Sequence, residues 1–106
     1  MTFDKDKDPQ FAFERRTVRM TAAGIVVLTQ KPPAPNWKFK SAEVKDDTLH
    51  QFSYDVPGTG NILHIKDDFL DKVLEAYSYN ITVELDGTPY TSPDPVIVND
   101  PGGGGS

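Results

Sequence analysis

The feature that most constrains the fold is a stretch in which polar and apolar side chains alternate without a break. Residues 77–85 read Tyr-Ser-Tyr-Asn-Ile-Thr-Val-Glu-Leu, so every odd position is aromatic or aliphatic and every even position is polar. Side chains of a β-strand point alternately to its two faces, and this period of two therefore buries one set and exposes the other. The pattern predicts a half-buried strand in which Tyr77 and Tyr79 are core residues.

Turn-forming residues divide the rest of the chain into short segments. The 106 residues include 8 Gly and 9 Pro, and the turns they indicate separate apolar or alternating segments. These segments are 11–20, 25–28, 37–40, 49–56, 62–65 and 96–98, and the β-branched 25–28 fits a buried strand. The residues from Asp68 to Leu74 predict one short helix capped by Asp67, because Phe69, Leu70 and Val73 would share a face. The whole pattern predicts an all-β sandwich of about seven strands with one short helical turn.

The length predicts a single domain. A chain of 106 residues is one domain in size, and we place that domain at residues 1–101. Residues 102–106 read Gly-Gly-Gly-Gly-Ser, the composition of a flexible engineered linker, which we expect to lie outside the fold.

Charge and composition exclude several classes of function. The net charge of −5 disfavours nucleic acid as a partner, because phosphate contacts from basic residues supply most of that affinity. The chain has no Cys, which removes disulfides, thiolate nucleophiles and zinc–thiolate sites. No apolar run of about 18 residues is present, so no membrane span is predicted.

The sequence contains no pattern typical of a catalytic or metal site. His50 and His64 lack the spacing of a zinc-binding pair, and no Ser lies in a Gly-x-Ser-x-Gly motif. An alternating Asp4, Asp6 and Asp8 resembles the start of a calcium loop, but the sixth and twelfth positions of that loop are Pro9 and Arg15 rather than Gly and Glu. We therefore predict that the protein is not an enzyme, binds no metal and uses no cofactor.

Aromatic residues outside the alternating strand are the candidates for carbohydrate binding. Sugar-binding modules use exposed rings against the apolar faces of pyranoses. We predict Trp37, Tyr54 and Tyr90 as the carbohydrate-binding residues. Trp37 ends the proline-rich segment 30–37, where its ring either anchors a ligand or covers the edge of the sandwich. The segment itself is expected to be a rigid edge loop, since it lacks the Arg that a polyproline ligand usually carries.

Part of the chain resembles a known family. Residues 60–73, Gly-Asn-Ile-Leu-His-Ile-Lys-Asp-Asp-Phe-Leu-Asp-Lys-Val, resemble the signature of X2 modules, and the likeness extends over residues 49–98. X2 modules are immunoglobulin-like domains found beside cellulases and in the scaffoldins of cellulosomes. The resemblance implies an immunoglobulin-like sandwich and a non-catalytic role, either weak attachment to cellulose or cell surfaces or the spacing of neighbouring modules.

These observations lead to one expected function and one alternative. We expect an extracellular or cell-surface accessory module of a larger bacterial protein, which spaces neighbouring domains and binds polysaccharide or cell wall weakly. The alternative is a protein–protein interaction or structural assembly module of a surface or phage protein. An exposed cluster of aromatic rings would favour the first, and a continuous exposed apolar patch or an open sheet edge would favour the second.

Overall fold

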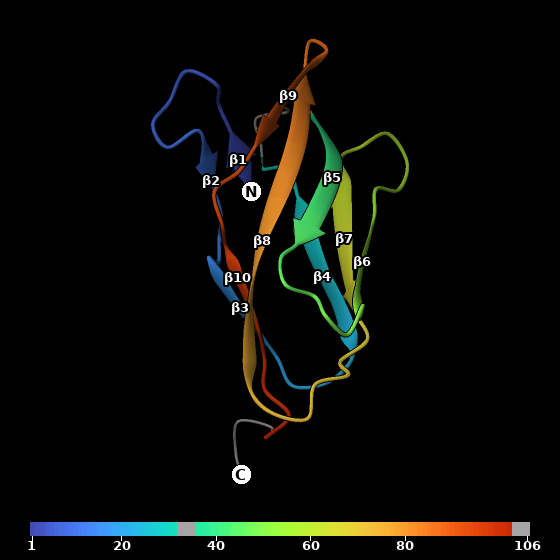
Figure 1. Ribbon diagram of the computed structural model, residues 1–106. Helices are drawn as coiled ribbons and strands as arrows, with labels where there is room; N and C mark the ends of the chain where they lie inside the picture. Colours follow the sequence, from blue (N-terminus) through green and yellow to red (C-terminus); the bar gives the residue numbers. More distant parts are fainter. Residues whose placement is uncertain (32–35, 103–106) are drawn as a thin grey trace.

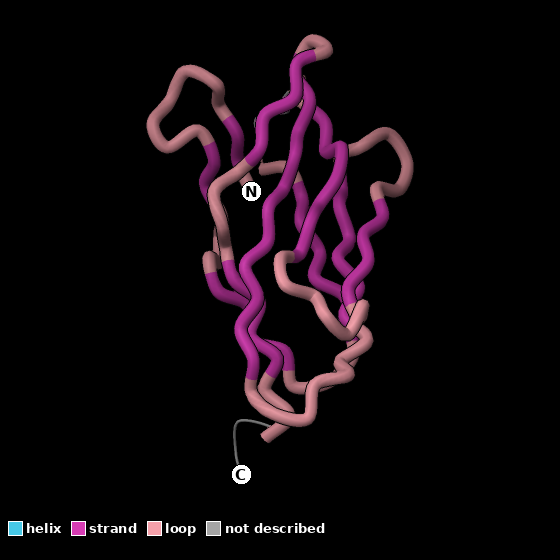
Figure 2. The backbone as a smooth tube through the Cα atoms, viewed as in Figure 1, coloured by secondary structure: helices cyan, strands magenta, loops and turns pink. Residues whose placement is uncertain are grey.

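A computed structural model gives the fold and describes residues 1–31 and 36–102, which contain ten β-strands and no helix (Figures 1 and 2). The strands, in chain order, are β1 (Thr2–Phe3), β2 (Phe11–Ala12), β3 (Thr17–Met20), β4 (Gly24–Thr29), β5 (Lys38–Val44), β6 (Phe52–Asp55), β7 (Ile62–Asp67), β8 (Glu75–Leu85), β9 (Thr88–Thr91) and β10 (Val96–Asn99). The all-β class predicted from the sequence is therefore confirmed. Among these described residues there is no helix that could cross a membrane.

The strands form two main sheets and one short ribbon. The larger sheet has the order β3-β10-β8-β5, with β9 paired to β8, and the smaller has the order β4-β7-β6. Strand β10 runs parallel to β3 and antiparallel to β8. The ribbon is the antiparallel pair of β1 and β2. This arrangement is compatible with a β-sandwich.

The alternation in β8 fills the core between the two sheets. Tyr79, Ile81 and Val83 are all 0% exposed, as the period of two predicts. They belong to one hydrophobic cluster with Leu63 and Ile65 of β7 in the smaller sheet. The prediction that the aromatic residues at the start of β8 are core residues is confirmed, since Tyr77 is also buried.

Strand β4 is less buried than its composition predicts. Val26 is buried, but Ile25 and Val27 are 55% and 53% exposed. The strand pairs with β7 in the smaller sheet, and its alternate side chains lie on the face of that sheet that points away from the core. The expectation of a buried strand at 25–28 is therefore correct for one face only.

An irregularity in β5 keeps both of its halves packed on the core. Phe39 pairs with Val83, but the register shifts before Ser41, which pairs with Thr82. A β-bulge of this kind changes which side chains face inward. As a result Phe39 is buried and Ala42, three residues later, also packs against the core.

The short helix predicted at 68–74 is wrong. The segment is an irregular loop, and Phe69 has a φ of 54°, which a right-handed helix does not accommodate. The amide of Phe69 donates to Asp67 Oδ1 at 2.9 Å, so Asp67 stabilises a turn in the place of a helix cap. The amide of Leu70 is taken by the side chain of Gln51, which is distant in sequence.

The molecule is elongated, with principal extents of 45 × 24 × 22 Å. One end, at the top of Figure 1, carries the β1–β2 connection, the start of β5 and the β8–β9 turn. We call it the pocket end. The connection formed by residues 68–74 lies at the bottom of Figure 1, and the connection formed by residues 45–51 lies above it in the lower half of the molecule. We call this region the loop end.

Candidate functional site

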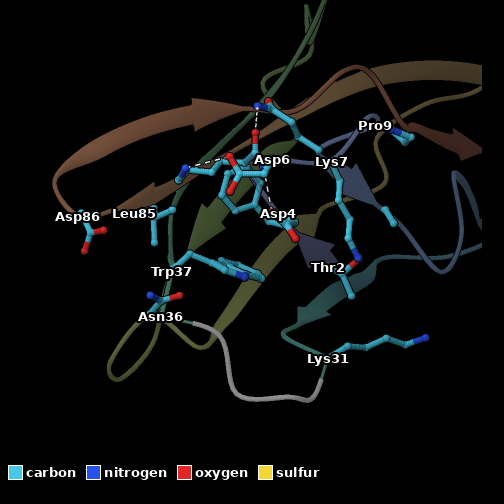
Figure 3. A pocket seen from close by; sticks show the side chains of 14 residues that line it. Thr2, Asp4, Asp6, Lys7, Pro9, Lys31, Asn36, Trp37, Leu85 and Asp86 are labelled. Atoms are coloured by element: carbon cyan, nitrogen blue, oxygen red, sulfur yellow. Dashed lines mark hydrogen bonds and ion pairs between the residues drawn. The ribbon is translucent and has the colours of Figure 1, made fainter.

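A pocket of about 630 Å³ lies at the pocket end (Figure 3). Three separate parts of the chain line it: residues 2–12, the described residues of the proline-rich segment, and the end of β8 with the turn that follows. The lining residues are Thr2, Phe3, Asp4, Lys5, Asp6, Lys7, Pro9, Gln10, Ala12, Lys31, Asn36, Trp37, Leu85 and Asp86.

Aromatic side chains form the floor of this pocket. Trp37 packs edge-on against Phe3 at 6.1 Å and against Phe39 at 5.0 Å between ring centroids. Phe3 also contacts Phe11 at 4.8 Å. Trp37 is only 3% exposed, so very little of its side chain is open to the pocket.

The wall contributed by the β1–β2 connection is held by its own polar groups. The Asp4 amide donates to the Gln10 carbonyl at 2.8 Å, which closes the loop. Asp4 Oδ1 accepts from the Asp6 amide at 3.0 Å, and Gln10 Nε2 donates to the Lys5 carbonyl at 2.9 Å. The Asp4 carboxylate and the Gln10 side chain therefore organise this loop. In the described residues no group of acidic or His side chains is arranged to hold a metal ion.

The charges on the rim offset one another. Three lysines and three aspartates line the pocket: Lys5, Lys7, Lys31, Asp4, Asp6 and Asp86. Lys5 Nζ forms an ion pair of 2.9 Å with Asp6, whose hydrogen bond raises the pKa of Lys5. Lys31 Nζ reaches Glu14 at 3.6 Å. A rim of this composition suits a neutral, hydroxyl-rich ligand better than a phosphate, which favours an excess of basic groups.

Hydrogen bonds of the first residue, Met1, link the pocket end to β4. The α-ammonium group of Met1 donates to the Thr29 carbonyl at 2.9 Å, and the Lys31 amide donates to the Met1 carbonyl at 3.2 Å. Burial of the ammonium group lowers its pKa. These bonds attach the first residue to the end of β4, so the wall that contains Phe3 is joined to the smaller sheet.

The structure brings two of the three predicted carbohydrate-binding residues together and leaves the third apart. Trp37 and Tyr90 both pack against Phe3, with ring centroids 6.1 Å and 5.1 Å from the Phe3 ring. Tyr54 lies on β6, is 50% exposed, and borders a separate hollow with Glu43 and Asn80. The buried Trp37 corresponds to the alternative in which its ring covers the edge of the sandwich.

Several residues of the pocket were not identified from the sequence. Asn36, Asp86 and Lys7 carry polar groups beside the floor, but they come from segments far apart in the chain. No periodicity or motif connects such segments, and only the fold places them around one hollow. Residues 32–35 of the proline-rich segment predicted as a rigid edge loop lie outside the described residues. At its two ends the Gln30 side-chain amide donates to the Trp37 carbonyl.

Comparisons with known proteins do not assign the chain to a family. A scan against protein-family models finds no match, and a search of the curated proteins finds no sequence match.

Proposed function

We propose that this protein is a non-catalytic accessory module that binds polysaccharide weakly at the pocket end and spaces neighbouring domains. The observation that carries the proposal is the composition of the pocket: an aromatic floor under a rim of amide, carboxylate and ammonium groups with no excess of either charge. Sugars present apolar C–H faces together with many hydroxyl groups, and this combination of surfaces can contact both.

The size of the pocket and the packing of its floor set the kind of binding expected. A volume of about 630 Å³ lies within the range of small-molecule sites, and it accommodates a short piece of a glycan. Trp37 cannot stack face-on with a pyranose, because its ring is 3% exposed. Affinity therefore depends on hydrogen bonds from groups such as Asn36 and Asp86, which also bond to water, and binding is weak.

We further propose that the sandwich is immunoglobulin-like and related to X2 modules, as part of an extracellular or cell-surface protein. The order β4-β7-β6 matches the B-E-D part of one sheet of that fold, and β5-β8-β10 matches the C-F-G sheet. The 45 Å length of the molecule supports a spacing role.

Fluorescence from the single Trp tests the polysaccharide proposal directly. Trp37 is the only Trp in the chain and lies on the pocket floor, so it reports on a bound ligand. We expect cellohexaose or soluble cell-wall glycan fragments to change its emission with millimolar affinity. The double variant Asn36→Ala/Asp86→Ala is expected to weaken the titration about tenfold.

A matched control uses the opposite end of the molecule. The double variant Asp68→Ala/Lys72→Ala changes two exposed polar residues at the loop end and is expected to bind the glycans like the unmodified protein. The proposal would be overturned if neither glycan class produced a saturable change in the Trp37 emission. Equal weakening by both double variants would show that the pocket is not the site.

A protein-interaction role is the second candidate, and a different observation favours it. Large aliphatic side chains are exposed at the loop end, remote from the pocket. A protein interface at that surface would be independent of polysaccharide binding.

A further inference from the structure

We infer that the loop end is a protein-docking tip, which packs its exposed aliphatic side chains against an apolar surface flanked by Lys or Arg residues on a partner protein. The tip consists of residues 45–51 and 68–74. Four of its side chains are large, aliphatic and substantially exposed: Leu49 (45%), Leu70 (50%), Val73 (63%) and Leu74 (61%). Isolated exposed leucines are normal on a protein surface, but a group of this kind at one end of a domain is typical of an interaction site.

Hydrogen bonds hold the two connections of the tip side by side. The Asp68 amide donates to the Gln51 carbonyl at 2.9 Å, and the Leu70 amide donates to Gln51 Oε1 at 2.7 Å. Gln51 is 1% exposed, so it is an internal link between the connections. The exposed Leu49 and Leu70 are therefore presented by one joined unit, which Figure 1 shows in the lower half of the molecule.

A buried polar cluster anchors this unit to the sheets. Asp71 accepts hydrogen bonds from Tyr77 Oη at 2.7 Å, from Gln51 Nε2 at 2.9 Å and from Asn99 Nδ2 at 3.0 Å. Tyr77 belongs to β8 and Asn99 to β10, so the connection is attached to two neighbouring strands of the larger sheet. Buried, connected networks of this kind rigidify a structure.

The backbone of the tip is held in conformations that side chains disfavour. His50 has a φ of 52° and Phe69 a φ of 54°, both in the left-handed region that non-glycine residues seldom adopt. Such residues persist only where the surrounding structure determines them, and they are concentrated at ligand-binding and switching sites. In this tip the surrounding structure is the polar cluster around Asp71.

The aliphatic residues are therefore exposed because hydrogen bonds hold the loop in place. The local sequence alone favours a different conformation. The spacing of Phe69, Leu70 and Val73 would place them on one face of a helix, which could then pack on the core. The anchors at Asp67 and Asp71 instead fix the segment as an irregular loop with Leu70 and Val73 facing solvent. Rigid presentation reduces the ordering entropy lost when a partner binds.

The charges around the tip indicate the partner's chemistry. Asp46, Asp68 and Glu75 are exposed beside the aliphatic side chains, and the whole chain has a net charge of −5. Lys66 partly offsets Asp68 across 3.7 Å, and Lys45 of the tip is paired with Asp94 at 2.9 Å. Lys72 is the other lysine of the tip. Complementary potentials favour a basic rim on the partner and disfavour both nucleic acid and an anionic bilayer.

The test uses a synthetic amphipathic helix as a probe of this chemistry. One peptide has a Leu/Phe face flanked by Lys and Arg, and a second has the same apolar face flanked by Glu. Titration of the isotope-labelled protein by NMR is expected to shift the amides of residues 49, 70, 73 and 74 with the basic peptide. We expect at least about tenfold weaker binding of the acidic peptide.

Two pairs of substitutions locate the contact. Leu70→Ser/Leu74→Ser should weaken the basic peptide about tenfold or more, as loss of buried anchors does. The control Ile25→Ser/Val27→Ser removes equally exposed aliphatic groups from β4 and should leave the affinity unchanged. Unaltered circular dichroism of both variants shows that folding is not the cause of a difference.

Four results overturn the inference. These are no saturable shift with the basic peptide, equal binding of the two peptides, unchanged binding by Leu70→Ser/Leu74→Ser, and equal weakening by the β4 control. A shift of the same amides by neutral phosphatidylcholine vesicles, without a response to the basic peptide, would identify a lipid surface instead. None of these results depends on the glycan titration at the opposite end.

Discussion

The two ends of the molecule distribute polar and apolar side chains in opposite ways. At the pocket end the aromatic residues Phe3 and Trp37 are buried and the charged residues around them are exposed. At the loop end Gln51, Asp67 and Asn99 are buried and the aliphatic residues around them are exposed. The first arrangement derives its stability from apolar burial, and the second depends on a network of buried hydrogen bonds.

This difference shows that the two ends serve different purposes in the fold. An apolar floor tolerates a variable rim, because the rim groups can bond to water. A buried polar cluster fixes one conformation, because each of its members requires a specific partner. The conformation of the loop end is therefore more tightly constrained than that of the pocket end, even though residues 45–51 and 68–74 contain no regular secondary structure.

The largest expected effect is on the free energy of unfolding when one apolar side chain at each end is truncated to Ala. Trp37→Ala removes a buried indole that packs on Phe3 and Phe39, and it should lower the free energy of unfolding by about 3–5 kcal/mol. Leu74→Ala, at a position 61% exposed, should change it by less than about 0.5 kcal/mol. Urea denaturation followed by circular dichroism measures both, and similar losses would contradict the assignment of the core.

The second effect tests the polar anchor. Asp71→Ala leaves the hydrogen-bonding groups of Tyr77 and Gln51 without their acceptor and should destabilise the protein by about 2–3 kcal/mol. Hydrogen exchange should accelerate most for the amides of residues 68–74, since this anchor holds them. Asp68→Ala, three residues away and exposed, is the control. Uniform acceleration along the chain would show that Asp71 does not act locally.

The third effect is a dependence on pH. Desolvation raises the pKa of Asp67, and its Oδ2 and the Oδ1 of Asn99 have no hydrogen-bond partner in the described residues. A folded pKa above the ordinary value of 3.8 means that the folded state binds more protons than the unfolded state in the interval between them. The stability contributed by protonated Asp67 is complete below that ordinary value and is lost as the pH rises through the folded pKa.

Asp67→Asn should remove this dependence, because an amide does not titrate. At neutral pH the substitution is expected to raise the free energy of unfolding by about 1 kcal/mol, since no carboxylate charge remains buried. Urea denaturation of both proteins between pH 3 and pH 8, with matched ionic strength, measures the difference. The depressed pKa of Asp100, which comes from its hydrogen bond with Arg19, acts in the opposite direction and is common to both proteins.

The smallest effect concerns the core between the two ends. Tyr79 is 0% exposed, its hydroxyl has no hydrogen-bond partner in the described residues, and burial raises its pKa to about 12. Tyr79→Phe removes an unpaired polar group and should stabilise the protein by up to about 1 kcal/mol. Tyr77→Phe is the matched comparison and should destabilise it, because the Tyr77 hydroxyl donates to Asp71. Destabilisation by both would indicate a partner for the Tyr79 hydroxyl.

Local patterns predicted the strands more successfully than the connections. The alternation of residues 77–85, the inward positions of Leu63 and Ile65, and the turn at Asp86-Gly87 can all be seen from short-range periodicity. The irregular loop at 68–74 could not be predicted in this way. Its conformation depends on the Gln51 and Tyr77 side chains, which are remote in sequence.

The candidate sites show the same division. Chemical character identified Trp37 and Tyr90 as notable aromatic residues, but the number of rings that face solvent was decided by packing on Phe3. Asn36 and Asp86 had no distinguishing signal, because a polar residue in a turn has the same pattern whether or not it borders a pocket.

The sequence by itself determined the all-β class, the inward face of its longest strand and the absence of cysteine chemistry, because each of these follows from local alternation or composition. Only the tertiary structure decided which apolar residues are covered. Trp37 is buried because Phe3 and Phe39 pack against it, whereas Leu70 and Val73 are exposed because distant polar side chains hold their backbone away from the core. Burial is a property of long-range contacts, and a segment considered alone does not contain them.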